Sequence, residues 1–302
     1  MPYRPTSRRF TSRTPAPLPP WALVVGALLS VLLVASGCTL QGGVAAVLPE
    51  ADVHHTTDLA YGPEERQALD VYRPRRGADQ PVVVFLHGGR WQVGSKAQYR
   101  LLGRTLARHG VVTVVPNYRL YPEATFPAWV DDAAAAVRWT YDHAHRFGGD
   151  ATQLYVVGHS AGAHTATLLA LDAQYLQEAG VPADAVQGVV SMAGPVDVEW
   201  TAPDIQALMG PEEDWAATYP AAQVDGTGIP LLLLHGTGDE TVAPGNSTRL
   251  AARIQDAGGC AEAVLYPGVG HIRIVLGLHF PWLLGGMVLH DLLSFVDVPA
   301  TC

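Results

Sequence analysis

A serine, an aspartate and a histidine each come directly after a short apolar run, in an order that suits nucleophilic catalysis. Ser160 lies in the pattern G-x-S-x-G, and Asp239 and His271 follow it along the chain. The runs before them are 154–157, one ending at Leu234 and one ending at Leu265. A serine hydroxyl is a weak nucleophile by itself, and it needs a base and a group that orients the base. We therefore predict that Ser160 attacks, His271 moves the proton and Asp239 orients His271.

Other residues compete for two of these roles. Glu240 is the neighbour of Asp239, and Asp197 follows another apolar run, so either carboxylate could orient the histidine instead. His279 and His290 lie downstream of His271 within an apolar stretch, where a packed or surface histidine is the ordinary explanation.

The run 81–86 is followed by His87-Gly88-Gly89-Arg90-Trp91. The two glycines let the backbone bend so that the amides of Gly88 and Gly89, together with that of Ala161, can point at a developing oxyanion. Trp91 is expected either to line the substrate pocket or to pack beneath this loop.

These residues are brought together by the elements that the chain predicts. Short aliphatic runs without polar alternation indicate strands that are buried on both faces of a parallel sheet. The strand-like runs are 53–61, 67–72, 81–86, 111–115, 154–157, 186–192 and 229–234, and the helix-like stretches are 97–108, 128–145, 161–176 and 247–257. Their alternation predicts an α/β fold with a mostly parallel, doubly wound sheet, and ligands bind such sheets beyond the carboxyl ends of the strands.

Two segments depart from this alternation. Residues 195–228 are rich in prolines and acids and contain Trp200 and Trp215, so we predict a short cap insert over the site. The stretch 272–293 is strongly apolar, but Arg273, His279 and Pro281 argue against a membrane span. We expect a helix from Pro281 to Phe295, preceded by an apolar lip at 272–280 beside the base.

The amino-terminal segment predicts export. Residues 1–20 contain four arginines and no acid, and an apolar run at 21–35 ends in Ala35-Ser36-Gly37-Cys38. This order is that of a signal peptide, 1–37, and the last four residues resemble a bacterial lipobox that would place a lipid on Cys38. An ordinary signal peptide or a short amino-terminal anchor is the alternative. A tether, 38–52, and a hydrolase domain, 53–302, would follow.

The composition adds three expectations. The formal net charge is −9 for 302 residues, and −13 without residues 1–37, which argues against nucleic acid as a partner. Cys260 and Cys302 are the only cysteines after Cys38, and in an oxidising compartment we expect them to pair, with two free thiols as the alternative. The histidine pairs do not converge with other ligands at a recognisable metal spacing, so neither a metal nor a cofactor is predicted.

Together these motifs resemble the esterase and lipase branch of the α/β-hydrolase superfamily, whose members include formamidase-like, feruloyl-esterase-like and hormone-sensitive-lipase-like enzymes. The matching stretches are His87–Trp91, Asn117-Tyr118-Arg119-Leu120-Tyr121-Pro122-Glu123, Phe126-Pro127-Ala128, Gly158-His159-Ser160-Ala161-Gly162-Ala163-His164 and Leu234-His235-Gly236-Thr237-Gly238-Asp239. The resemblance implies the α/β-hydrolase fold, and it assigns the same catalytic and oxyanion residues as the chemistry above.

The expected activity is cleavage of small-molecule carboxylic esters through an acyl-enzyme, in a protein that is extracytoplasmic and lipid-anchored, or secreted if Cys38 is not modified. An amidase or formamidase with the same triad is the nearest alternative. A non-catalytic lipoprotein of the same fold is a further one. The residues leave the acyl group, the alcohol and the oligomeric state open.

Overall fold

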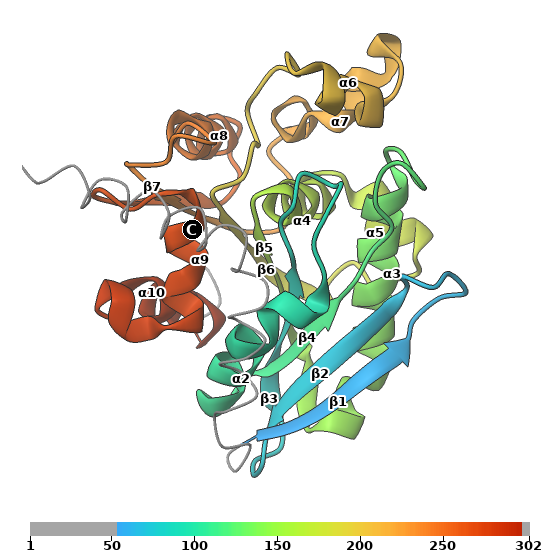
Figure 1. Ribbon diagram of the computed structural model, residues 1–302, viewed down its shortest axis with the longest axis vertical. Coiled ribbons are helices and arrows are strands. Elements are labelled where there is room, and N and C mark those ends of the chain that lie inside the picture. The colour runs from blue at the N-terminus through green and yellow to red at the C-terminus, as the bar shows by residue number, and fades with distance from the viewer. Residues whose placement is uncertain (1–52, 298–302) are drawn as a thin grey trace, which may run out of the picture.

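The computed structural model describes residues 53–297 (Figure 1). The predictions for the signal peptide, the tether, Cys38 and Cys302 fall on residues outside this range. They remain predictions.

Eight strands form one sheet in the order β1-β2-β4-β3-β5-β6-β7-β8. The first two strands pair antiparallel with each other, β2 also pairs antiparallel with β4, and all the remaining neighbours are parallel. The strands are β1 (Val53–Ala60), β2 (Ala68–Pro74), β3 (Gln80–Leu86), β4 (Val112–Pro116), β5 (Gly149–His159), β6 (Val186–Met192), β7 (Leu231–Gly236) and β8 (Ala261–Tyr266). The predicted α/β architecture with a mostly parallel sheet is confirmed.

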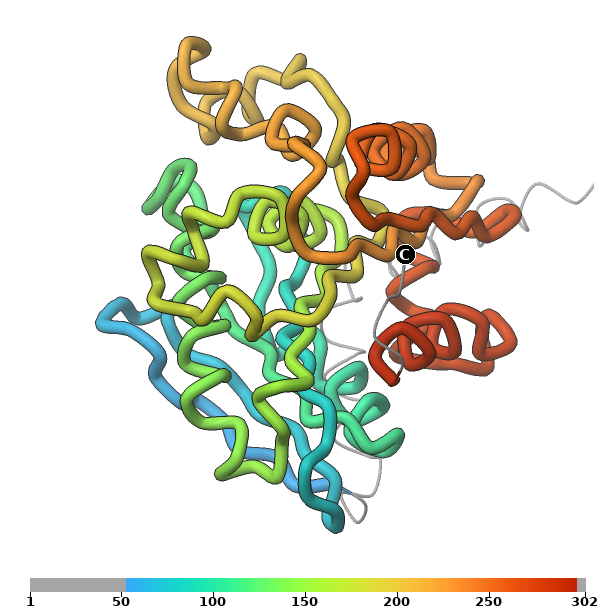
Figure 2. Tube along the Cα trace, turned by 180° about the vertical axis from the view of Figure 1, so that it is seen from behind, coloured from blue at the N-terminus to red at the C-terminus, as the bar shows by residue number. Residues whose placement is uncertain are grey.

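Helices cover both faces of the sheet, as Figure 1 and Figure 2 show from opposite sides. One layer holds α2 (Arg100–Arg108), α9 (His271–His279) and α10 (Met287–Asp297), and the other holds α3 (Ala128–His143), α4 (Ala161–Leu171), α5 (Ala173–Glu178) and α8 (Gly245–Asp256). Alternate side chains of β3 enter the two resulting cores: Val82 and Val84 face the second layer, and Val83 and Phe85 face the first. The unpatterned apolar runs of the sequence arise from this two-sided burial.

Three predicted helices are shorter than expected or divided. The stretch 161–176 breaks at Asp172, which is extended and accepts a hydrogen bond from the Gln174 amide, so that a second helix begins there. The stretch 128–145 ends as a helix at His143 and continues as the 3₁₀ turn η3 (Ala144–Phe147), and 97–108 begins as η2 (Lys96–Tyr99). Local side-chain capping of this kind competes with helix continuation and is hard to place from periodicity.

The predicted helix from Pro281 to Phe295 is wrong at its start. Pro281 opens only the 3₁₀ turn η6 (Pro281–Leu284), and Gly285 and Gly286 then adopt left-handed conformations that end it. The helix α10 begins at Met287. The expected apolar lip at 272–280 is itself the helix α9, and one side of it packs into the core.

The segment 195–228 folds into short helical pieces above the carboxyl ends of the strands (Figure 1). They are α6 (Pro203–Met209), η4 (Glu212–Asp214), α7 (Trp215–Thr218) and η5 (Pro220–Gln223). His164 of α4 holds this segment through the Thr218 carbonyl, at 2.8 Å from Nε2, and Trp200 donates to the Thr218 hydroxyl at 2.6 Å. Within residues 53–297, none of the helices combines the length and apolarity that a bilayer crossing requires.

Candidate active site

Ser160 occupies the sharp turn between β5 and α4. Its backbone angles are φ 56° and ψ −118°, a strained conformation for a residue with a side chain. A β-carbon on Gly158 would lie 2.2 Å from the Gly162 carbonyl oxygen, and one on Gly162 would lie 2.2 Å from that of Leu86. Both flanking positions therefore require glycine, because the strand and the helix meet at the serine.

His271 lies within hydrogen-bond distance of both Ser160 and Asp239, although the three residues come from separate parts of the chain. The His271 Nε2 atom is 2.9 Å from Ser160 Oγ, and His271 Nδ1 is 2.7 Å from Asp239 Oδ2. A carboxylate can only accept, so Nδ1 carries a proton, and Nε2 of the neutral ring then accepts from the serine hydroxyl. This is the arrangement that a serine nucleophile and its base require.

Asp239 is held as an anion by its surroundings. Its Oδ1 accepts from the amides of Thr241 and Val242, both at 2.9 Å, and its Oδ2 is also 3.2 Å from His235 Nε2. Burial raises the pKa of this carboxyl, but the Val242 amide and His271 outweigh burial and hold the pKa below its usual value. A charged Asp239 fixes both the tautomer and the orientation of His271.

The competing residues lie elsewhere. Glu240 is exposed, and Asp197 pairs with Arg249, at 2.5 Å from Nε. His279 is buried beside Tyr99, with ring centroids 5.6 Å apart, and His290 is exposed on α10.

The amides predicted to stabilise the oxyanion differ in whether they already donate to another group. The Gly88 amide donates to the Tyr99 hydroxyl at 3.3 Å, a bond that it would exchange for one to an oxyanion, and its assignment stays a prediction. Gly89, at φ 130°, keeps its amide free of any acceptor within the described residues, and so does Arg90, the next residue. With Ala161 at the first turn of α4, these amides are available to an oxyanion.

A cavity of about 250 Å³ opens onto Ser160. Its walls come from the loop after β3, the start of α4, the segment 195–228 and the loop after β7, and they include Trp91, Ala161, Val198, Trp200, Ile205 and Val242. Trp91 is buried, and its ring meets His164 and Trp200 edge to face at 5.0 and 6.0 Å. Trp91 therefore both lines the cavity and packs beneath the loop, so the two expectations for it are compatible.

Arg90 connects this loop to the segment above it. Its Nη2 lies 2.5 Å from Asp204 Oδ2, and the side-chain amide of Gln92 donates to the same oxygen at 3.2 Å. Both members of the ion pair are about half exposed, so its contribution to stability is small. It bridges the loop after β3 to α6 at the mouth of the cavity.

His159 and His235 contact residues of the triad, and neither of them was predicted from the sequence to do so. His159 is buried, and its Nε2 donates to the His271 carbonyl at 2.9 Å, so that the residue before the nucleophile holds the loop of the base. Burial and the neighbouring His271 lower the pKa of His159 to about 3, which keeps its ring neutral. His159 lies in the motif around Ser160 and His235 in the motif that ends at Asp239, but only the folded structure shows which residues they contact.

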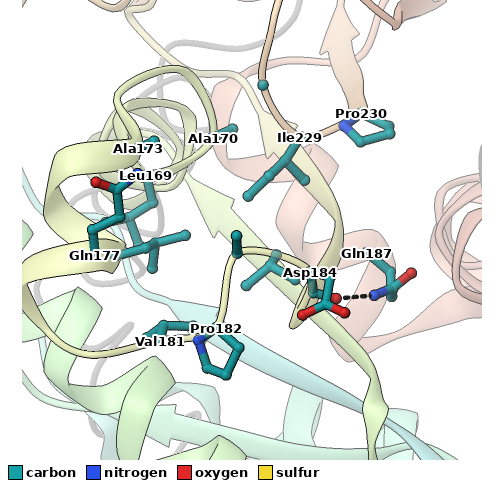
Figure 3. A pocket seen from close by; sticks show the side chains of 14 residues that line it. Leu169, Ala170, Ala173, Gln177, Val181, Pro182, Asp184, Gln187, Ile229 and Pro230 are labelled. Carbon is teal, nitrogen blue, oxygen red and sulfur yellow. Dashed lines mark hydrogen bonds between the residues drawn. The ribbon is translucent and has the colours of Figure 1, made fainter.

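A second, larger cavity of about 480 Å³ lies at the opposite end of the sheet (Figure 3). It is formed by the end of α4, by α5 and by the residues that enter β6 and β7. Asp184 is its only titratable residue, and the Asp184 backbone carbonyl accepts from the Gln187 side chain at 2.6 Å. Because it lacks a serine, cysteine or threonine nucleophile among its lining residues, this cavity is not the candidate site.

Cys260 is disulfide-bonded. Its predicted partner, Cys302, lies outside the described residues, so the pairing itself remains a prediction.

Several known proteins that the chain resembles are named esterases. The profile of the BD-FAE family matches residues 69–254. The isoprenylcysteine alpha-carbonyl methylesterase ICME of Arabidopsis thaliana is 27% identical over 256 residues, which cover 72% of this chain and 56% of that protein. Esterase LipQ of Mycobacterium tuberculosis is 32% identical over 228 residues, covering 67% and 53%. The chain spans about half the length of the curated relatives it matches, 51% for one of them.

Solved structures share the fold. Esterase B from Lactobacillus rhamnosis, inhibited by a tributyrin phosphonate, superposes with a TM-score of 0.75 at 24% identity and covers 93% of this chain and 96% of its own. An esterase from the archaeon Pyrobaculum calidifontis gives a TM-score of 0.71 at 24% identity, with 93% and 98% covered.

Proposed function

The chain belongs to the BD-FAE family and has the α/β-hydrolase fold, and from that premise we propose that it is a serine hydrolase that cleaves carboxylic esters. The observation that carries the proposal is the pair of hydrogen bonds from His271, 2.9 Å to Ser160 and 2.7 Å to Asp239. The names of the relatives, which include a methylesterase and an esterase, support the same bond type.

The first step forms an acyl-enzyme. Ser160 Oγ attacks the ester carbonyl carbon while its proton passes to His271 Nε2, and the imidazolium is stabilised by the Asp239 carboxylate. The carbonyl oxygen becomes an oxyanion, which the amides of Gly89, Arg90 and Ala161 are available to stabilise. Collapse of this intermediate breaks the bond to the alcohol oxygen, and His271 returns the proton to the leaving alcohol.

The second step releases the acid. A water molecule loses a proton to His271 and attacks the acyl carbon, and Ser160 leaves with the proton that His271 gives back. The cavity beside Ser160, with Trp91, Trp200 and Ile205 among its walls, would take an apolar group of the substrate.

We further propose that the protein acts outside the cytoplasm, anchored by a lipid on Cys38. The order of basic residues, apolar run and Ala35-Ser36-Gly37-Cys38 supports this placement. Metabolic labelling with a fatty-acid probe tests it, and a label that persists after Cys38→Ser would overturn it.

The activity is tested by turnover of a short-chain aryl ester with the wild-type protein, Ser160→Ala and His271→Ala. We expect both variants to lose at least about three powers of ten in kcat. Full activity of either variant would refute the proposal. Turnover of a formyl-aryl amide in the same assay separates an esterase from an amidase, because the esterase favours the acetyl ester.

A further inference from the structure

The helix α9, which begins at His271, is apolar on two opposite sides. Ile274 and Leu278 are buried in the core that α9 shares with α2 and α10. Ile272 is 58% exposed, and Leu276, one turn further, is half-buried on the same side. A surface helix normally has one apolar side, which packs against the core. The second apolar side of α9 is therefore a candidate surface for binding another molecule.

The exposed apolar surface continues past the end of α9. Phe280 is half-buried and its ring lies 6.1 Å from that of Trp282, which is 76% exposed, and Met287 at the start of α10 is 48% exposed. We call Ile272, Leu276, Phe280, Trp282 and Met287 the outer apolar face. Trp282 is the most exposed of the large apolar side chains described in residues 53–297.

The charge around this face is unlike that of the rest of the chain. The protein has a net charge of −9, yet residues 263–290 contain no aspartate or glutamate. They carry Arg273 and three histidines, His271, His279 and His290. The first carboxylate beyond them, Asp291, lies one helical turn after Met287 and accepts from the Tyr266 hydroxyl at 2.6 Å. The exposed Arg273 favours contact with phosphate groups.

The position of the face relative to the amino-terminal segment fits one partner in particular. The structure begins at Val53, which belongs to the same core as α2 and α9, and α2 packs against α9. Figure 1 shows α2, α9 and α10 on one side of the sheet, with the start of β1 next to α2. A chain of fifteen residues from Cys38 to Val53 spans at most about 50 Å, so a lipid on Cys38 would hold Val53 within that distance of the bilayer.

We propose that the outer apolar face docks on the surface of a phospholipid bilayer, with Trp282 seated at the interface. Tryptophan is favoured at that depth because its ring is apolar and its N–H is polar. Since α9 begins at His271, docking brings the helix that carries the base to the lipid, where esters that partition into the membrane are concentrated. This last consequence rests on the proposed function, whereas the docking itself does not.

The decisive measurement is quenching of tryptophan fluorescence by lipids. The chain is used from Thr39 onward, so that neither the lipid-bearing Cys38 nor the apolar run 21–35 with Trp21 contributes, and it is mixed with vesicles of phosphatidylcholine and phosphatidylglycerol whose acyl chains are brominated or not. We expect brominated lipid to quench the protein, and we expect Trp282→Phe to remove most of that quenching. Trp139→Phe is the matched control, because Trp139 is half-buried against His143 on the other side of the sheet.

A second variant tests the energetic role of the face. In the same protein, Trp282→Glu should weaken vesicle binding about tenfold or more. The reason is that a charged carboxylate would replace a ring that the bound state inserts into the lipid. Leu265→Glu is the control: Leu265 is 41% exposed and lies on the same face of β8 as Ala263, which packs in the other core. Quenching that survives Trp282→Phe, or equal binding of the two glutamate variants, would overturn the proposal.

Turnover of a water-soluble aryl ester is measured for every variant. It should stay at the level of the parent protein, because Trp282 does not line the cavity beside Ser160. A parent protein that is quenched by the lipid but hydrolyses no ester would refute the proposed function and leave the docking intact.

Discussion

At the scale of single residues, the site depends on one buried carboxylate, that of Asp239, which lies within hydrogen-bond distance of two histidines. Asp239 Oδ2 lies 2.7 Å from His271 and 3.2 Å from His235, and His235 Nδ1 is held by the Ser247 hydroxyl at 2.7 Å. Burial lowers the pKa of His235, so this ring stays neutral and donates to the carboxylate without neutralising it. Asp239 therefore remains available as the anion that stabilises the His271 imidazolium.

Replacing this carboxylate should affect the rate rather than substrate binding. Asp239→Asn keeps the size of the side chain but removes its charge and the acceptor that fixes the His271 tautomer. We expect kcat for an aryl ester to fall by about three to four powers of ten with KM nearly unchanged.

Asp204→Asn is the matched control, because Asp204 lies near the cavity but pairs with Arg90 at the surface. We expect less than a tenfold change in kcat. Equal losses in the two variants would contradict the role given to Asp239.

The three triad residues could be predicted from the sequence, but the hydrogen bonds that hold the loops around them could not. Ser160, Asp239 and His271 follow strands that the apolar runs predict, so their meeting at one edge of the sheet follows from topology. The bond between the Gly88 amide and Tyr99, and that between His159 and the His271 carbonyl, depend on packing between segments far apart in the chain. No local pattern encodes such contacts, so neither bond could be predicted from the sequence.

At the scale of elements, the turn between β5 and α4 is the part most sensitive to substitution. Gly162→Ala would place a β-carbon 2.2 Å from the Leu86 carbonyl oxygen, and backbone cannot move aside cheaply. We expect a loss of more than about 3 kcal/mol in the free energy of unfolding, measured with urea.

Gly245→Ala is the comparison at the start of α8. There the nearest atom, at 2.6 Å, is the end of the flexible Arg249 side chain, which can rotate away. We expect a change within about 1 kcal/mol. A Gly162→Ala protein as stable as Gly245→Ala would show that the elbow tolerates a side chain.

The errors at this scale also have physical causes. The helix predicted at 161–176 was cut by the Asp172 cap, and the one predicted from Pro281 was displaced by two left-handed glycines. Apolar periodicity predicted that these stretches are helical and buried, but it does not locate the single polar or glycine residue that interrupts them.

At the scale of the whole molecule, burial of neutral histidines should make the fold sensitive to acid. Burial lowers the pKa of His87, His164 and His279 to about 4, and burial with the neighbouring His271 lowers that of His159 to about 3. In the unfolded chain these rings titrate near the ordinary value of about 6.5, so between roughly pH 6.5 and 4 the unfolded state binds more protons than the folded one.

Stability should therefore fall as the pH drops through this window. Unfolding near pH 5 should take up as many as about four protons from these histidines, which appears as a steep pH dependence of the free energy of unfolding in urea. His164→Gln, which can still donate to the Thr218 carbonyl, should reduce that uptake by about one proton. A free energy that is flat from pH 7 to pH 5 would contradict the assignment.

The helix layers on the two faces of the sheet hold different parts of the site. The layer of α3, α4, α5 and α8 supports the elbow, while the layer of α2, α9 and α10 carries the base at the start of α9 and the outer apolar face. The same helix thus connects the reacting atoms with the surface that we expect to meet the membrane.

The proposed hydrolysis requires an activated Ser160, which covalent labelling can detect. The protein is treated with a fluorophosphonate, and the labelled peptide is identified by mass spectrometry, with Ser160→Ala and His271→Ala alongside. Activation of Ser160 by His271 predicts one label, on Ser160, that is absent from the first variant and forms at least about a hundredfold more slowly in the second. Absence of the label from the wild-type protein, or labelling that His271→Ala leaves unchanged, would contradict it.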